Sequence, residues 1–352
     1  MVKKKKIAII QARLNSVRLP NKILFKIDGL SLIEILYKRL KRSKQLDDIV
    51  IATTPSSENL INFLKKKKIN FFVGNEQNVL KRYYFAAKKY EADIIVRITA
   101  DGILADPKLV DKFLNNYTNL KVDYLSNQKP VTYPDGLDIE IFNFKTLKYA
   151  YLKAKSKYDK EHVTPFIQNN KIFKKYNLEN DKNLSDIRLT LDETEDFDSL
   201  KKIFKFFKPD IYFGWEKIVS SIKEQKILLS NKNLKRNEGS SMTVSKKLWR
   251  RAKKIIPGGN MFLSKRPELF HPEKWPAYFK RSKGINIWDI DGIKYKDLSL
   301  MGVGCNIMGY SNNKIDNAVI KALKNGNGST INSYEEVELC EKLLSLHKWA
   351  DM

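Results

Sequence analysis

Short apolar runs alternate with longer amphipathic stretches over the first 100 residues of the chain. Apolar runs of a few residues are typical of buried strands, whereas a period near 3.6 residues is typical of helices. On this basis the pattern predicts strands at 7–10, 48–53, 71–73 and 93–99, and helices at 31–43, 58–67 and 78–90. Strands that alternate with helices form parallel βαβ units, so the pattern predicts a layered α/β fold.

The alternation is less regular between residues 120 and 210. The pattern there predicts strands at 122–126, 137–142 and 187–191, and helices at 143–155, 159–169 and from the last strand to about 207. These elements extend the α/β domain without repeating its simple order.

A polar stretch without an apolar period, NKNLKRNEGSSMTV, occupies residues 231–244. We interpret it as a linker between a first domain at 1–230 and a second segment at 245–352. In the second segment the pattern predicts a helix that Pro257-Gly258-Gly259 stops, then a hairpin and two helices. Their expected ranges are 245–255, 285–298, 313–324 and 334–346.

The net charge of +26 raises the question of a nucleic-acid partner. Only 12 of the 66 positive residues are arginine, and the lysines are spread over most of the predicted helices. Scattered lysine is typical of a solvated surface, which also attracts nucleotides and phosphosugars. We therefore expect no specific nucleic-acid partner.

Cysteine content and apolar run length indicate the compartment. Cys305 and Cys340 are too few for a disulfide framework or a zinc cluster, which favours a reducing compartment. The apolar run after MVKKKK is too short for a signal peptide, and no run is long enough to span a membrane. We expect a cytoplasmic protein without membrane insertion.

The loop after the first predicted strand carries candidate chemistry. Its sequence is QARLNSVRLPNK, and it includes Arg13, Ser16, Arg18 and Lys22. Loops that follow strands of an α/β sheet lie at the edge where ligands bind, and backbone N–H groups and cations in a turn bind phosphate. Three basic residues in a loop also fit a solvated turn, and the loop has no glycine of a Walker or dinucleotide motif.

Five segments in order resemble the cytidylyltransferase family, which includes CMP-acylneuraminate and CMP-KDO synthetases, nearest to the spore coat polysaccharide biosynthesis type. They are QARLNSVRLPNK at 11–22, VRITAD at 96–101 with Asp106-Pro107, YPDGLDIE at 133–140, EHVTPF at 161–166 and RLTLDETED at 188–196. The resemblance covers about residues 6–208. It implies the three-layer α/β/α nucleotide-diphospho-sugar transferase fold.

The resemblance also implies roles for individual residues. Asp101 and Asp192 match aspartates that hold the metal bridging the nucleotide phosphates, so Mg²⁺ is the expected cofactor. An N-cap of the following helix is the alternative for each of these two aspartates. The expected catalytic residues are Arg13, Lys22 and Asp101, and the expected nucleotide-binding residues are Ala12, Arg13, Ser16, Arg18, Lys22 and Asn78.

The sugar side is expected at Tyr133, Asp135, Asp138, Glu140 and His162. Asp138 and Glu140 share one face of a predicted strand, and a solvated face is the alternative for both. For Asp138 the resemblance leaves a part in metal binding as a further alternative. For His162 the alternative is a helix cap. The chain departs from the family pattern at Gly102-Ile103, Asn78 and Lys160, which leaves the base and the sugar open.

Residues 245–352 resemble the N-terminal portion of class III pyridoxal-phosphate aminotransferases, nearest to glutamate-1-semialdehyde aminomutases. The matching segments are 245–259, 283–298, 308–323 and 334–344. The family's cofactor lysine and phosphate-binding turn come later than the part matched here, so pyridoxal phosphate is expected only in a full-length aminotransferase. An independent interaction module is the alternative for this segment.

Together these features predict a metal-dependent nucleotidyltransferase in surface polysaccharide biosynthesis. Its expected substrates are CTP and a 2-keto sugar acid or sugar phosphate, with pyrophosphate as the second product. One alternative is a non-catalytic nucleotide- or nucleic-acid-binding module. Another is a function named for the aminotransferase half of a longer fusion protein, and a homodimer is also left open.

Overall fold

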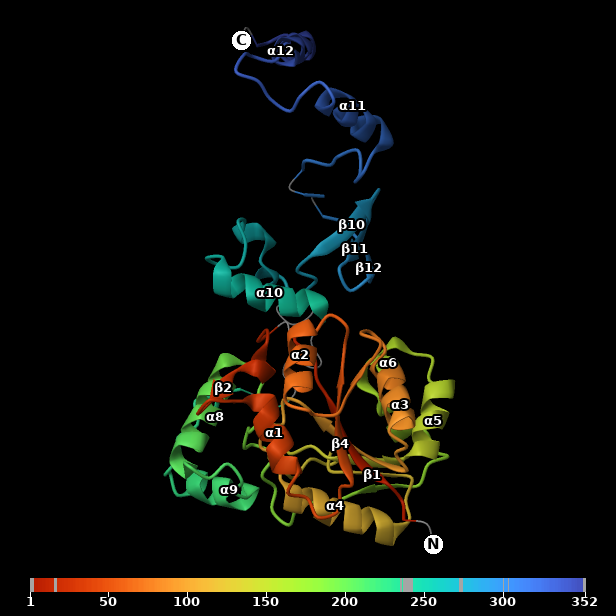
Figure 1. Cartoon of the computed structure of the whole chain (residues 1–352). Coiled ribbons are helices and arrows are strands. Elements are labelled where there is room, and N and C mark those ends of the chain that lie inside the picture. The colour runs from red at the N-terminus through yellow and green to blue at the C-terminus, as the bar shows by residue number, and fades with distance from the viewer. Residues whose placement is uncertain are drawn as a thin grey trace. The chain divides into compact units, whose positions relative to one another are not determined.

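The structure is a computed structural model, and its chain divides into two units, residues 1–240 and 241–352 (Figure 1). It describes residues 3–15, 18–234, 236, 243–271, 275–299, 301–302 and 304–350. Among the described residues, no helix is both long and apolar enough to cross a membrane.

The first unit is built on a seven-stranded mixed sheet. Its order is β5-β4-β1-β6-β8-β7-β9, in which β1, β4, β5 and β6 are parallel and β8 is antiparallel to both of its neighbours. The strands are β1 (Lys6–Gln11), β4 (Asp48–Thr53), β5 (Phe71–Val73), β6 (Ile94–Thr99), β7 (Tyr124–Ser126), β8 (Glu140–Asn143) and β9 (Lys175–Asn177). The first four agree with the predicted strands.

Helices cover both faces of this sheet, which confirms the three-layer α/β/α fold (Figure 1). One face packs against α1 (Leu32–Leu40), α2 (Glu58–Lys66), α4 (Pro107–Leu120), α8 (Thr194–Phe207) and α9 (Trp215–Lys223). The other packs against α3 (Val79–Lys89), α5 (Phe144–Lys153) and α7 (Pro165–Asn169), with α6 (Lys157–His162) beside α3. A short 3-10 helix (Lys22–Leu24) and the hairpin β2 (Lys26–Ile27) and β3 (Leu30–Ser31) precede α1.

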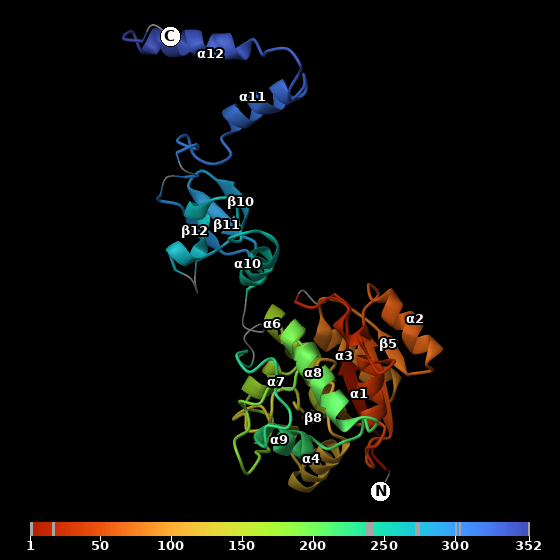
Figure 2. The same ribbon diagram turned by 90° about the vertical axis from the view of Figure 1, so that its left-hand side faces the viewer.

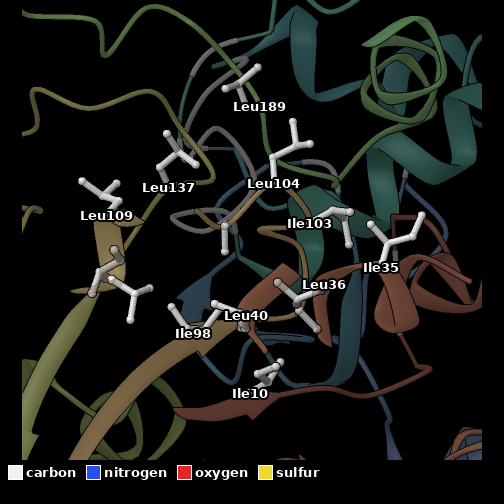
Figure 3. Packing of buried hydrophobic residues seen from close by; sticks show 14 of the residues in the cluster. Ile10, Ile35, Leu36, Leu40, Ile98, Ile103, Leu104, Leu109, Leu137 and Leu189 are labelled. Carbon is white, nitrogen blue, oxygen red and sulfur yellow. The ribbon is translucent and has the colours of Figure 1, made fainter. Parts of the chain in front are cut away.

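Alternate residues of each strand belong to opposite cores, as the two-residue period of a strand requires. In β1, Ile7 and Ile9 face the α3 side, whereas Ala8 and Ile10 face the α1 side. Figure 3 shows Ile10 of β1 and Ile98 of β6 packed with leucines of α1 and with Ile103 and Leu104 of the following loop. A strand buried on both faces reads as a continuous apolar run, which is why the sequence revealed these strands.

Helices α4 and α9 are connected at their N-termini, and both lie at the lower end of the first unit (Figures 1 and 2). Asp106 is the N-cap of α4 and accepts from the backbone N–H of Lys108 at 2.8 Å and of Leu109 at 3.1 Å. Its second carboxylate oxygen accepts from the N–H of Trp215, at the start of α9, at 3.0 Å. The sequence analysis predicted neither helix.

Two elements differ from the sequence expectation. The segment 187–191 is not a strand, and only Arg188 bridges to Asp135, because this part of the chain pairs with a loop rather than with the sheet. The helix expected at 159–169 is two helices. Val163 lies between them with φ 73° and Pro165 starts the second, because a proline lacks the N–H that a continuous helix needs.

The second unit contains a helix, a small sheet and two further helices. They are α10 (Val244–Ile255), the antiparallel strands β10 (Phe279–Lys283), β11 (Asn286–Asp289) and β12 (Lys294–Lys296), α11 (Asn313–Leu323) and α12 (Glu335–Leu346). The predicted hairpin corresponds to β11 and β12, and β10 adds a third strand. Helices α11 and α12 bury none of their residues, so apolar side chains such as Ile320, Leu339 and Leu346 are exposed.

The start of the predicted linker packs on the first unit. Asn231 is 2% exposed, and its amide donates to the carbonyl of Arg188 at 3.1 Å and to the carboxylate of Asp196 at 2.7 Å. Arg236 contacts the loop at 133–138. Residues 237–242 lie outside the described residues, so of the stretch 231–244 the structure assigns at least 231–234 and 236 to the first unit.

Candidate active site

The loop after β1 folds over the carboxyl ends of the parallel strands. The backbone N–H of Ala12, which is buried, donates to the carbonyl of Ala52 at the end of β4 at 3.0 Å. The N–H of Leu14 donates to the hydroxyl of Ser57 at 3.1 Å. These bonds bring the basic loop to the sheet edge where the sequence placed it, although Ser16 itself lies outside the described residues.

Two cations of this loop converge on one carboxylate. Lys22 Nζ lies 2.8 Å from Asp192 Oδ1 and donates to the carbonyl of Leu191 at 2.5 Å. Arg18 Nη2 lies 2.7 Å from the same Asp192 oxygen. Burial alone raises the pKa of Asp192, but Lys22, Arg18 and Arg188 outweigh it and hold that pKa below its ordinary value. The carboxylate is therefore ionised, and two cations are concentrated at the strand ends.

Asp101 lies beside this group. The N–H of Leu191 donates to the carbonyl of Asp101 at 3.0 Å, so Asp101 and Asp192 stand on adjacent backbone segments. Neither aspartate is an N-cap, because Asp106 caps α4, and Glu193 caps α8 in a capping box with Asp196. The helix-cap alternative for both residues is thus wrong.

The donor set suits a magnesium ion shared with a nucleotide. Among the described residues, no three His, Cys, Asp or Glu side chains form a group that could hold a metal by themselves. Mg²⁺ usually takes one or two carboxylates and completes its shell with phosphate oxygens and water. Asp101 and Asp192 supply hard oxygen donors next to a basic loop, and this donor set agrees with that preference of Mg²⁺.

Arg188 connects the segment 187–191 to the loop at 133–138. Its guanidinium forms two bonds of 2.8 Å to Asp196 and lies 3.0 Å from Asp135 Oδ2. Asp135 and Asp196 are both buried. Burial is the main cause that raises the pKa of Asp135, to about 6, although Arg236 and Arg188 lower it.

Asp138 has a different arginine partner. Arg236 Nη2 donates to Asp138 Oδ1, and Arg236 Nη1 donates to the carbonyl of Tyr133 at 3.2 Å. The Asp138 side chain is 30% exposed, more than the 8% of Asp135. Asp138 is thus the more accessible carboxylate of the loop at 133–138.

Glu140 belongs to a buried polar network rather than to a solvated face. It is 1% exposed, pairs with Arg97 of β6 and accepts from the Tyr124 hydroxyl at 2.5 Å. The Gln168 amide donates to the same hydroxyl at 2.9 Å. The solvated-face alternative is therefore wrong for Glu140. Its partner Arg97 also donates to the Gln11 side chain, at the end of β1, at 3.4 Å.

The side chains of two other residues expected on the sugar side have different surroundings. Tyr133 is 1% exposed, and its ring packs against Phe113 and Trp215 in the core, so it offers no accessible surface to a substrate. His162 is the last residue of α6 rather than the start of a helix, because Val163 interrupts the expected helix, and its ring lies 4.5 Å from that of Tyr158.

On the nucleotide side, Asn78 and Arg13 take different positions. The Asn78 side chain is the N-cap of α3 and accepts from the N–H of Lys81 at 2.8 Å. Arg13 is exposed and lies near the buried Arg82, whose pKa is lowered first by burial and further by the Arg13 charge. An exposed arginine in the loop after β1 can reach a phosphate.

The sequence analysis missed three arginines of this region: Arg97, Arg188 and Arg236. Arg97 and Arg188 stand inside the quoted segments VRITAD and RLTLDETED. Most cations of this chain are lysine, so an arginine inside a quoted segment is itself a signal, because buried ion pairs favour arginine. Arg236 carried no local signal, since it lies in a polar stretch.

Comparison with known proteins supports the resemblance of the second unit. The glutamate-1-semialdehyde 2,1-aminomutase of Methanococcoides burtonii is 37% identical over 108 residues, which are 31% of this chain and 24% of that protein. The match is in the C-terminal region. The second unit is therefore similar to about a quarter of an aminomutase.

The first unit has longer matches. An uncharacterized protein of Methanocaldococcus jannaschii is 42% identical over 58% of this chain and 86% of its own length. The spore coat polysaccharide biosynthesis protein SpsF of Bacillus subtilis is 30% identical over 56% of this chain and 85% of its own. The structure of a cytidylyltransferase from Leptospira borgpetersenii matches with a TM-score of 0.62 and 31% identity, over 65% of this chain and 98% of that one.

These likenesses agree with the arrangement of cations and carboxylates at the strand ends, and they support an enzyme that transfers nucleotidyl groups. The family model for cytidylyltransferases matches residues 7–236, more than half of the chain. The chain belongs to the cytidylyltransferase family.

Proposed function

We propose that this enzyme transfers CMP from CTP to an acidic sugar, either a 2-keto sugar acid or a sugar phosphate, and releases pyrophosphate. The observation that carries the proposal is the convergence of Lys22 and Arg18 on Asp192 beside Asp101. The similarity to SpsF supports a place in the synthesis of a surface polysaccharide. We further propose that the enzyme acts in the cytoplasm.

In this proposal an oxygen of the acceptor attacks the α-phosphorus of CTP, and the bond from that phosphorus to the pyrophosphate oxygen breaks. An acceptor hydroxyl releases its proton to solvent in this step, whereas an ionised phosphate has none to release. Lys22, Arg18 and Arg13 bind the triphosphate and stabilise the charge that grows on the leaving pyrophosphate. Asp101 and Asp192 would hold Mg²⁺, which supplies charge neutralisation at the phosphates. Most of the acceleration then comes from positioning and electrostatics.

Lys22 is poised for this role by its contact with Asp192. A buried ammonium without a counter-charge is costly, and the Asp192 carboxylate provides one before the nucleotide arrives. When the triphosphate binds, phosphate oxygens offer Lys22 and Arg18 the same kind of charge-assisted bond. Lys22 and Arg18 therefore have anionic partners both before and after the triphosphate binds.

A screen of pyrophosphate release tests the proposal. We expect CTP to exceed ATP, GTP and UTP by at least about 10-fold with one acceptor class, because a difference of ~1.4 kcal/mol in binding the base is enough for that ratio. The panel contains 2-keto sugar acids, sugar phosphates and neutral sugars as controls. Absence of pyrophosphate release with every nucleotide, or equal rates with all four, would contradict the proposal.

DNA binding at two salt concentrations, measured beside pyrophosphate release, distinguishes the enzyme from a non-catalytic nucleic-acid-binding module. A duplex DNA binder loses affinity steeply between about 50 and 200 mM salt, because counterions are released from the phosphates. We expect weak DNA binding without sequence preference, together with pyrophosphate release that DNA does not inhibit at 200 mM salt.

The second unit is expected to bind no pyridoxal phosphate by itself. It matches about a quarter of an aminomutase, and a pyridoxal enzyme needs a lysine that forms a Schiff base with the cofactor. After incubation with pyridoxal phosphate and borohydride, we expect no specific pyridoxyl adduct by mass spectrometry and no transaminase activity from this chain. An adduct on one lysine together with amino transfer would falsify the assignment.

We propose that the catalytic domain extends from the N-terminus to about Arg236, slightly beyond residue 230. The packing of Asn231 and the contacts of Arg236 support this boundary. The linker then spans the residues between Arg236 and α10, and the aminotransferase-like segment begins at about 245.

A further inference from the structure

The stretch that follows α9 returns to the strand ends and is anchored there at two points. The N–H of Ser230 donates to the hydroxyl of Ser199 at 2.8 Å, and Asn231 bonds to Arg188 and Asp196 as described above. Arg236, six residues after Ser230, contacts the loop at 133–138. We call residues 230–236 the anchored segment, with Lys235 outside the described residues.

The guanidinium of Arg236 uses all three of its nitrogens on that loop. Nη2 donates to Asp138 Oδ1, Nη1 donates to the Tyr133 carbonyl at 3.2 Å, and Nε lies 3.6 Å from Asp135 Oδ1. Its side chain is 15% exposed. Arg236 is largely covered and two of its N–H groups are held by this loop, so we expect it to act on a substrate through the carboxylate that it contacts.

Asp138 is the carboxylate that depends on this contact. Burial raises the pKa of Asp138, the charges of Glu140 and Asp101 raise it further, and Arg236 opposes them. Asp135 differs because Arg188 also pairs with it. Among the ion pairs of the described residues, Arg236 is the partner of Asp138, so its loss would leave Asp138 facing two like charges.

The Asp138 oxygens are used unequally. Oδ1 accepts from Arg236, whereas no described residue donates to Oδ2. A carboxylate fixed through one oxygen presents the other in a defined direction, and an ionised carboxylate is a strong acceptor for a hydroxyl. With its side chain 30% exposed, Asp138 is accessible to a ligand that carries hydroxyl groups.

We infer that Arg236 is a positioning residue for the acceptor: it orients Asp138 so that its free oxygen accepts a hydrogen bond from a hydroxyl of the sugar. The inference rests on the proposed function and adds a residue outside the quoted family segments. The acceptor class is a polyhydroxylated sugar acid or sugar phosphate. The nucleotide is bound by the loop after β1, so the two substrates respond differently to Arg236.

The test compares Arg236→Gln, Arg236→Lys and the control Lys232→Gln in the full chain. Lys232 is exposed on the same anchored segment. With Arg236→Gln we expect the KM for the acceptor to rise about 10- to 100-fold, the range expected when a hydrogen bond to a charged group is lost. The KM for CTP should stay within about twofold and kcat within about threefold, while Arg236→Lys restores part of the acceptor KM and Lys232→Gln matches the wild type.

Two outcomes overturn the inference. An unchanged acceptor KM in Arg236→Gln shows that Asp138 does not need the arginine. Equal losses in both KM values and kcat, with a lower unfolding temperature and no rescue by lysine, show a merely structural role. If the wild type releases no pyrophosphate with any acceptor, the proposed function fails instead.

The contact itself has a readout that needs no activity. An arginine-specific protease cleaves after Arg236 only when its side chain leaves Asp138, so we expect Asp138→Asn to speed this cleavage by about 10-fold, equal to ~1.4 kcal/mol of lost contact. Asp198→Asn, on the exposed side of α8, is the control. Equal cleavage rates in the wild type, Asp138→Asn and Asp198→Asn would show that Asp138 does not hold Arg236, and the inference would then be wrong.

Discussion

Replacing Asp101 by asparagine is expected to lower turnover at least ~100-fold, the loss seen when a group that stabilises transition-state charge is removed. Asp101 and Asp192 lie on adjacent backbone segments. The variant keeps the size and one oxygen of the side chain but loses the charge that would hold magnesium against the phosphates. Pyrophosphate release at saturating CTP measures the effect.

The magnesium dependence makes the prediction specific. We expect Asp101→Asn to need a higher magnesium concentration for half-maximal activity, whereas Asp198→Asn should keep both turnover and magnesium dependence. Asp106 caps α4, so Asp101→Asn removes no helix cap and the unfolding temperature should change little. A variant with most of its magnesium-dependent activity intact would remove Asp101 from the mechanism.

Replacing Arg188 by methionine is expected to lower the free energy of unfolding by about 3 to 5 kcal/mol, because removal of one partner leaves buried charges uncompensated. Asp196 is 0% exposed and Asp135 is 6% exposed, and Arg188 bonds to both. Urea unfolding at pH 7.5 measures the loss. Arg42→Met is the matched control, since Arg42 lies on the surface over the Tyr212 ring and should cost no more than about 1 kcal/mol.

The loss in Arg188→Met should also depend on pH. The pKa of Asp135 is already raised to about 6 by burial, and without Arg188 it rises further. A carboxyl with a raised folded-state pKa contributes stability at low pH that is lost as the pH rises through that value. The deficit of Arg188→Met should therefore be smaller at pH 5 than at pH 8, and a loss below about 1 kcal/mol at both would show that the pair is not buried in solution.

Much of the first unit was predictable from local pattern. The run at 7–10 is apolar throughout, and those at 48–53 and 93–99 are mostly apolar between their ends, because both faces of these strands are covered by helices. The position of the loop after β1 followed from chain order, since that loop must emerge at the carboxyl edge. The segment 187–191 shows the limit of this reasoning, because its apolar residues belong to the core while its backbone bridges to a loop and forms no strand.

The candidate site was predictable only in part. The resemblance predicted Lys22, Arg18 and Asp192 as residues of one site, and the structure places the charged atoms of Lys22 and Arg18 within 2.8 Å of the Asp192 carboxylate. It did not identify Arg188 or Arg236, and it placed the buried Tyr133 among the substrate-binding residues. Burial and ion pairing of a loop residue depend on which distant segment covers it, and the sequence does not state that.

The sequence by itself determined the α/β architecture, the place of the basic loop after β1 and the resemblance of both units to known families. The reason is that strand burial, helix period and chain order are local properties. Only the tertiary structure decided how charges are paired, because the partners are far apart in sequence: 170 residues separate Lys22 from Asp192, and 98 separate Asp138 from Arg236. Electrostatic energy depends on distance in space, and folding alone sets that distance.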